Sequence, residues 1–378
     1  PGSPPSPLQT ELQTPPPSAA PPPVSAPSAL LADLDTGQVL YARAPRARRP
    51  IASLTKVMTA LLVLESSRLD DQVTVPPEAA AQTGSLLGLR AGERLTVEDL
   101  LYGLLLASAN DAAVALADHV AGSVPAFVER MNRRARRLGL RDTRFASPSG
   151  LDASGYSTAQ DVARLVRAAY RWPEFARVVR TKVREIPAPQ GPPRRIQNRN
   201  VLLWLYPGAI GVKSGFTAAA GFTAAAAAAR RGLRLLAVVL GSPTSAFDDA
   251  AALLDYGFRA FERVRLLERG QRVAELRAGA LRVPVLAGRG VVRLVRPGST
   301  REPEVAFVPA PSLPASVAPG DRVGRVVVLL GRRRVAAVPA VAGPAVPLPG
   351  PALDRAEGFR AAVELALGLL RALVRAFL

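Results

Sequence analysis

The sequence contains no cysteine and only one histidine, His119. The absence of cysteine excludes disulfide bridges, thiolate zinc sites and a cysteine nucleophile, and one histidine leaves a single candidate for a histidine-based triad. His119 stands near a predicted helix end, where a structural role is favoured. We therefore expect neither a metal nor a cofactor, and any catalysis must rest on serine, lysine, aspartate or glutamate.

Lysine is scarce as well. Only three of the 49 basic residues are lysine, namely Lys56, Lys182 and Lys213, and all the others are arginine. An ammonium group can be deprotonated near neutral pH, whereas a guanidinium group cannot. In a chain that uses arginine for almost every positive charge, a lysine indicates a position that requires a side chain able to lose a proton.

Aromatic residues make up only 5% of the chain, although its formal net charge is +19. Such a charge would suit a nucleic-acid binder, but the arginines are spread from Arg43 to Arg375 and few aromatic rings are present to stack on bases. We therefore expect no nucleic-acid partner. A solvated cationic surface would suit an anionic membrane or cell-wall polymer instead.

The N-terminal segment lacks the composition of a packed core. Eleven of the first 27 residues are proline, and most of the others are small or polar. This composition predicts an extended linker over residues 1–27. The sequence opens at Pro1 with neither Met nor an apolar signal segment, which favours a processed, exported chain over a trimmed one.

The C-terminal segment lacks an apolar run that could span a membrane. Residues 358–378 are mostly apolar, but their longest charge-free run is six residues, whereas a span needs about 20. At about 100° per residue, the charged residues fall on one side of a helix: Arg360, Glu364, Arg371 and Arg375. We expect residues 351–378 to contain an amphipathic helix that anchors the chain to a membrane surface through 358–378, with docking on the protein itself as the alternative.

Between these ends, apolar periodicity predicts a mixed domain over residues 28–262. The stretch "SALLADLDTGQVLYARA" has two apolar runs around an Asp-Thr-Gly turn, which is typical of a β-hairpin. Residues 208–242 predict three strands, although the alanine run 224–229 favours a helix by intrinsic propensity. Ser157 and Asp161 mark the start of one helix. Helical periodicity covers residues 53–66, 97–120, 124–138 and 158–170.

The pattern changes after residue 262. Residues 263–350 contain short Val- and Leu-rich runs separated by Gly and Pro, with no sustained helical period. This pattern of short apolar runs and turn residues predicts a small all-β domain.

Three short motifs combine residues that can carry chemistry. Ser53 and Lys56 stand three residues apart at a helix start, where their side chains are neighbours and the lysine can activate the hydroxyl. Ser108-Ala109-Asn110 stands at the edge of an apolar helical run, a polar turn that could present a hydroxyl and an amide into a cleft, and Lys213-Ser214-Gly215 lies on a predicted strand. Each motif alone is common, but the ordered set is specific.

With these motifs the chain resembles the low-molecular-mass penicillin-binding proteins, which are serine-type D-alanyl-D-alanine carboxypeptidases. The stretches "SGLDASGYSTAQDVARL", "QNRNVLLWLYPGAIGVKSGFT" and "ALLDYGF" are also similar to that family. The resemblance implies an α/β (α+β) penicillin-binding/β-lactamase-like domain, an antiparallel sheet flanked by helices, followed by the small β domain. It also implies an exported enzyme, in the cell wall or on the outer face of the bacterial cytoplasmic membrane, that acts on peptidoglycan stem peptides.

The resemblance implies a role for each motif residue. Ser53 would be the acylated nucleophile and Lys56 its general base. Ser108 would relay a proton to the leaving D-alanine, Asn110 would hold the cleft and the substrate amide, and Lys213 would polarise Ser108 and attract the terminal carboxylate.

The third motif would also bind substrate. Ser214 and Thr217 would hydrogen-bond the carboxylate, and Gly215 would allow close approach of the substrate backbone. The backbone N–H groups of Ser53 and Phe216 would form the oxyanion hole. β-Lactam antibiotics would inhibit the enzyme by acylating the same serine.

Three positions depart from the family pattern. Ser214 replaces a more usual threonine, Phe216 replaces a frequent histidine, and Ala246 stands where many relatives have a carboxylate-binding arginine. Two other functions stay open from the sequence. A serine β-lactamase would need a further carboxylate to activate water, and a non-catalytic penicillin-binding cell-wall scaffold would not need the intact motifs.

Overall fold

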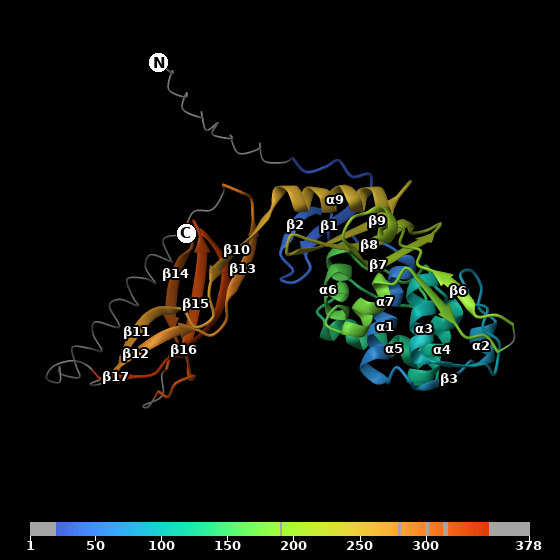
Figure 1. The fold of residues 1–378 in the computed structure, drawn as a ribbon, viewed down its shortest axis with the longest axis horizontal. Helices are drawn as coiled ribbons and strands as arrows, with labels where there is room; N and C mark the ends of the chain where they lie inside the picture. The colour runs from blue at the N-terminus through green and yellow to red at the C-terminus, as the bar shows by residue number, and fades with distance from the viewer. Residues whose placement is uncertain (1–19, 190, 279–280, 299–301, 313–316, 348–378) are drawn as a thin grey trace, which may run out of the picture. The chain divides into compact units, whose positions relative to one another are not determined.

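The structure is a computed structural model that describes residues 20–189, 191–278, 281–298, 302–312 and 317–347 (Figure 1). These residues form two compact units that divide between Ala260 and Phe261. No helix in the described ranges is both long and apolar enough to cross a bilayer. The proposed anchor at 358–378 lies outside the described residues and stays a prediction.

A five-stranded antiparallel sheet organises the first unit. Its strand order is β2-β1-β9-β8-β7, so the predicted N-terminal hairpin lies beside the last of the three predicted strands. The strands are β1 Ser28–Asp33, β2 Val39–Arg43, β7 Ala209–Thr217, β8 Gly221–Arg230 and β9 Leu233–Ser242. The alanine run forms the middle of β8 because tertiary packing overrides its helix propensity.

Helices cover both faces of this sheet. Helix α9, Ala246–Ala260, packs on one face against β8 and β9, and α6, Ala159–Ala169, packs on the other face with the remaining helices (Figure 1). The alanines of β8 from Ala224 to Ala228 are at most 1% exposed, so both faces of that strand are covered. Small side chains there let two layers of helices approach the sheet closely.

The helical part of the first unit holds the large core. The helix bounds are α1 Lys56–Ser66, α2 Pro77–Ala80, α3 Val97–Tyr102, α4 Asn110–Ala121, α5 Val124–Arg137, α7 Pro173–Arg180 and α8 Leu202–Leu205. The same unit contains two small antiparallel sheets of two strands each: β3 Gln72–Thr74 with β4 Arg94–Thr96, and β5 Val183–Ile186 with β6 Arg194–Gln197. A buried cluster of Leu, Val and Ala side chains from α1, α3, α4 and α6 fills the space between them.

The structure corrects three predictions of local detail. The helix predicted over 97–120 is interrupted, because residues 103–107 widen into a π-helical turn and Ser108 then adopts a left-handed conformation with φ 62°. Helix α6 is capped by Thr158 rather than Ser157, since Thr158 Oγ1 accepts from Asp161 N at 3.1 Å. Residues 24–26, expected to be linker, pack against α9: Ser25 N and Ala26 N donate to Asp249 at 2.8 and 2.9 Å.

The second unit is all-β, as predicted. A six-stranded antiparallel sheet has the path β11-β12-β16-β15-β14 with β17 beside β12, and β10 pairs with β13. Its core consists mainly of valines, among them Val285, Val326 and Val328. The strands are β10 Glu262–Leu267, β11 Arg272–Ala278, β12 Leu281–Ala287, β13 Val291–Val295, β14 Glu304–Pro309, β15 Arg322–Leu330, β16 Arg333–Ala342 and β17 Val346–Pro347.

Candidate active site

Ser53 lies in a 3-10 turn, Ala52–Thr55, that leads into α1. Ala52, the residue before it, has φ 46°, a left-handed conformation that a residue with a β-carbon adopts only at some cost. This turn leaves Ser53 partly exposed while Lys56, at the first position of α1, is completely buried. The predicted neighbours at i and i+3 are in contact, with Lys56 Nζ 3.0 Å from Ser53 Oγ.

Lys56 has two further partners, and both are hydrogen-bond acceptors. Its Nζ donates to Asn110 Oδ1 at 2.8 Å and to the backbone oxygen of Ser149 at 2.8 Å. A neutral amine has two N–H bonds and one lone pair. If those N–H bonds go to the two carbonyl oxygens, the lone pair faces Ser53 Oγ, where a base must accept the hydroxyl proton.

The surroundings of Lys56 favour that neutral form. Burial is the largest cause that lowers its pKa well below the usual value, and the positive charges of Lys213 and Arg199 lower it further. The carboxylate of Asp111 acts in the opposite direction. The arginine-rich chain thus keeps lysine at a position where only lysine can be deprotonated.

The second motif lies on the turn that interrupts the long helix. The left-handed Ser108 ends the π-helical turn, and α4 restarts at Asn110, so the two residues stand on either side of one sharp bend. Both are buried, with exposures of 4% and 2%. Asn110 Nδ2 donates to Thr83 O at 2.7 Å, which fixes the amide so that its oxygen faces Lys56.

The third motif lies on the edge strand β7, which passes directly over the nucleophile. A β-carbon on Gly215 would lie 2.7 Å from Ser53 N, so only glycine allows this approach. The sequence suggested that Gly215 makes room for a substrate backbone, and the structure adds that it makes room for the backbone at Ser53. Phe216, directly after it, is 58% exposed and packs its ring 4.7 Å from that of Phe222.

Lys213 is buried on the same strand, with 2% exposure. Burial lowers its pKa to about 7, and the charge of Arg199 adds to the effect. Its Nζ donates to Ser214 O at 2.8 Å. The role of Lys213 in polarising Ser108 stays a prediction. Thr217 Oγ1 accepts a hydrogen bond from Ala220 N at 3.1 Å. Its hydroxyl proton is not used in that bond, so the side chain can still act as a donor.

Two charged residues at the site were missed by the sequence analysis. Arg199 is exposed, its guanidinium donates to Ser85 Oγ at 2.6 Å, and its charge acts on both active-site lysines. Asp111 is buried, and its carboxylate accepts from the backbone N–H groups of residues 87–89 and 112. The only sequence signal for them was their place beside the motifs, in "QNRN" and "SAND".

The other conspicuous residues have simpler surroundings. His119 lies in the last turn of α4, and Trp204 on α8 has Lys182 Nζ 6.0 Å from its ring. Ala246 is buried at the start of α9, so that position supplies no cation. In the part of the chain that the structure describes, no group of three or more His, Cys, Asp or Glu side chains could hold a metal ion.

Comparison with known proteins identifies the same motif-bearing region. Residues 16–244 match the D-alanyl-D-alanine carboxypeptidase family, and residues 261–348 match the C-terminal domain of penicillin-binding protein 5. The chain belongs to the D-alanyl-D-alanine carboxypeptidase family. The predicted resemblance is thereby confirmed, and the serine-type carboxypeptidase assignment is confirmed at the level of the family.

Individual relatives support this placement. The D-alanyl-D-alanine carboxypeptidase DacD of Escherichia coli is 41% identical over 68% of this chain and 69% of its own length. DacF of Bacillus subtilis is 36% identical over 66% of each chain, so these matches span about two thirds of the relatives. The solved structure of penicillin-binding protein 5 from Haemophilus influenzae has a TM-score of 0.75 at 31% identity and covers 86% of this chain and 98% of its own. The predicted penicillin-binding-protein fold with a C-terminal β domain is confirmed.

Proposed function

We propose that this protein is a serine carboxypeptidase that removes the terminal D-alanine from peptidoglycan stem peptides through an acyl-enzyme on Ser53. The observation that carries the proposal is the contact between a partly exposed serine hydroxyl and a buried lysine whose other two partners are both acceptors. Family membership supplies the substrate class. Together they support a reaction in which an amine base activates serine against a peptide carbonyl.

In the acylation step, Ser53 Oγ attacks the carbonyl carbon of the penultimate D-alanine while Lys56 accepts its proton. The negative charge that develops on the carbonyl oxygen would be stabilised by the N–H groups of Ser53 and Phe216. The close approach of β7 at Gly215 supports this pairing, because it brings the two segments together. The C–N bond then breaks, and the departing amine of D-alanine takes the proton from Lys56 through a relay that we assign to Ser108, which returns Lys56 to its neutral form.

We assign recognition of the terminal carboxylate to side chains of β7. Lys213 supplies a positive charge and Ser214 and Thr217 supply hydroxyl groups, as the family pattern implies. Because Ala246 provides no cation, we propose that Arg199 contributes the second positive charge. Water then hydrolyses the ester on Ser53, and Lys56 serves again as the base that activates it.

The proposal is tested by D-alanine release from a peptide ending in D-Ala-D-Ala. The wild-type protein should release D-alanine catalytically, and Ser53→Ala should release none while keeping the same circular dichroism spectrum. A β-lactamase would instead hydrolyse penicillin rapidly and leave the peptide intact. A scaffold protein would bind penicillin without either turnover.

We further propose that the enzyme acts outside the cytoplasm and contacts an anionic membrane through residues 358–378. The supporting observations are the net charge of +19 and the one-sided placement of charged residues in that segment. β-Lactam antibiotics would be its covalent inhibitors, since they present a strained amide to the same serine.

A further inference from the structure

One of the two acceptors that hold Lys56 comes from an irregular loop, residues 144–156. The loop ends pair with each other, since Arg144 and Tyr156 exchange two backbone hydrogen bonds of 2.9 Å. In between, Ser149 O accepts from Lys56, and Pro148 O accepts from Thr59 Oγ1 at 2.6 Å. A β-carbon on Gly150 would lie 2.0 Å from Ala52 O, so this loop, hereafter the Ser149 loop, is pressed against the nucleophile turn.

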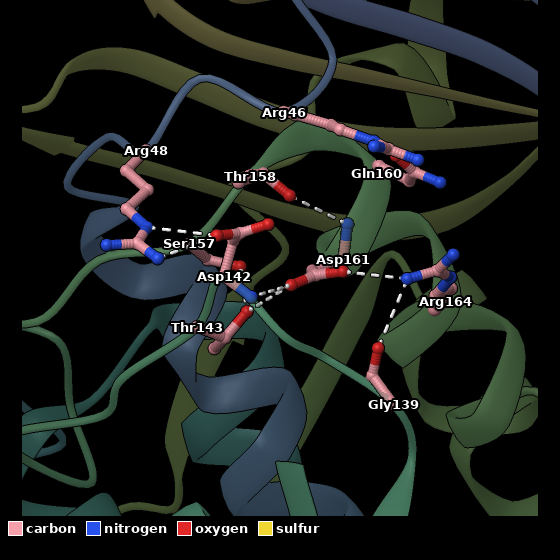
Figure 2. A network of polar contacts seen from close by, with 10 residues as sticks. All are labelled: Arg46, Arg48, Gly139, Asp142, Thr143, Ser157, Thr158, Gln160, Asp161 and Arg164. Atoms are coloured by element: carbon pink, nitrogen blue, oxygen red, sulfur yellow. Dashed lines mark hydrogen bonds and ion pairs between the residues drawn. The ribbon is translucent and has the colours of Figure 1, made fainter. Parts of the chain in front are cut away.

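A buried carboxylate holds the base of the Ser149 loop, and Figure 2 shows it at the centre of its network. The side chain of Asp161, at the start of α6, is only 3% exposed. Its Oδ2 accepts from the backbone N–H of Asp142 at 2.9 Å and from Thr143 Oγ1 at 3.0 Å. Its Oδ1 faces the guanidinium of Arg164 at 3.1 Å. The carboxylate thus ties the segment that enters the loop to α6.

The segment that leaves the loop is tied to the same point. Thr143 Oγ1 lies 2.8 Å from Ser157 Oγ, and Ser157 exchanges backbone hydrogen bonds of 2.8 and 2.9 Å with Arg49. Arg49 is four residues before Ser53 in the sequence. Asp161 therefore joins the start of the loop, the end of the loop and the approach to the nucleophile.

We propose that Asp161 is a positioning residue for Lys56: its carboxylate fixes the base of the Ser149 loop and so holds the carbonyl that aims the Lys56 lone pair at Ser53. This inference rests on the base role proposed above for Lys56. An amine that loses Ser149 O can rotate about its last bond, and its lone pair then leaves Ser53 Oγ. Misplacement of a catalytic group by about 1 Å can cost about 10²-fold in rate.

The network requires a charged carboxylate rather than an isosteric amide. Both oxygens of Asp161 accept, with two donors on Oδ2 and a cation on Oδ1. An asparagine has one oxygen and one NH₂ group, so in either orientation the NH₂ faces donors. Asp161→Asn should therefore release the loop without changing the volume of the side chain.

A matched control exists elsewhere in the same unit. Asp249 is also a buried carboxylate that accepts two backbone N–H groups and a hydroxyl, from Ser25 and Ala26, but it holds residues 24–26 and not the Ser149 loop. We expect Asp249→Asn and Asp161→Asn to lower the melting temperature by similar amounts. Only the Asp161 variant should change the chemistry.

The test is the pH profile of D-alanine release by the full chain. For Asp161→Asn we expect kcat to fall about 10- to 100-fold with a smaller change in KM, and the ascending limb to move to higher pH. Burial is the main cause that depresses the pKa of Lys56, and a loosened loop lets water reach the amine. The pKa of Lys56 therefore rises, and the ascending limb of the pH profile rises with it. The charged groups that face Lys56 from other elements, Lys213, Arg199 and Asp111, are the same in all variants.

Two outcomes would overturn the proposal while leaving the function intact. One is an Asp161→Asn enzyme with the wild-type pH profile and kcat, and the other is an Asp249→Asn enzyme with the same losses. If Asp161→Asn does not fold, Thr143→Val and Thr143→Ser replace it. The serine variant keeps the hydroxyl and should restore the wild-type profile that the valine variant loses, and equal profiles would overturn the proposal. If the wild type itself releases no D-alanine, the proposed function fails instead.

Discussion

Replacing Lys213 by methionine should stabilise the first unit while it abolishes D-alanine release. Lys213 is buried, and its pKa is lowered to about 7 from an ordinary value of 10.5. At 1.36 kcal/mol per pKa unit, this gap corresponds to a cost of about 5 kcal/mol for burying the charged lysine at acidic pH. Methionine has a similar length and no charge, so the variant avoids this cost and loses only the hydrogen bond to Ser214 O, worth about 1 kcal/mol.

The sign of the pH dependence follows from linkage. Because the folded-state pKa is depressed, the stability associated with neutral Lys213 is fully present above the unfolded-state value of 10.5. It is lost as the pH falls from 10.5 through about 7, since the unfolded chain binds the proton first. The stability advantage of Lys213→Met should therefore be about 3 kcal/mol larger at pH 6 than at pH 9.

Urea unfolding followed by tryptophan fluorescence measures this difference. Both tryptophans of the chain, Trp172 and Trp204, lie in the first unit, so the signal reports on the unit that contains Lys213. Lys182→Met is the matched control, because it removes the lysine outside the catalytic motifs. If the advantage of Lys213→Met is the same at pH 6 and pH 9, or if the variant is the less stable protein, the account of a buried, destabilised lysine is wrong.

Three further predictions concern the base, the carboxylate site and the anchor. Lys56→Arg should slow acylation by at least about 10² and remove the ascending limb of the pH profile, and a similar rate with the same profile would show that Lys56 is not the base. Arg199→Gln should raise KM about tenfold and move the pKa of Lys213 upward, because it removes a cation that depresses it; an unchanged KM would exclude Arg199 from substrate binding. Deletion of residues 358–378 should abolish sedimentation with anionic liposomes without changing turnover of a soluble peptide, and persistent sedimentation would reject the anchor.

Much of the fold could be predicted because periodicity reports burial. The hairpin, the three strands after residue 208 and the all-β second unit follow from alternation and turn residues. The break at Ser108 could be predicted only in part. The polar Ser108-Ala109-Asn110 indicates a turn beside an apolar run, but the helical period over 97–120 does not show that residues 103–107 widen into a π-helical turn or that Ser108 is left-handed.

In the candidate site, too, residues within one short motif could be predicted and residues that act across long sequence separations could not. Ser53 and Lys56 could be paired because they stand three residues apart at a helix start, and Asn110 could be added because its motif resembles that of the family. Arg199 and Asp161 act across long sequence separations, through Ser85 in one case and through Asp142 and Thr143 in the other. Such contacts depend on how the loops fold back, which local pattern does not encode.

Locating the covalent adduct tests the central claim most directly. Full-length protein would be incubated with benzylpenicillin, quenched in acid and digested with trypsin, which releases Ser53 in the peptide of residues 49–56. Fragmentation then separates Ser53 from Thr55, the other hydroxyl in that peptide. We predict one penicilloyl group on Ser53, absent from Ser53→Ala and formed far more slowly in Lys56→Arg. An adduct on any other residue, or D-alanine release by Ser53→Ala, would contradict the account.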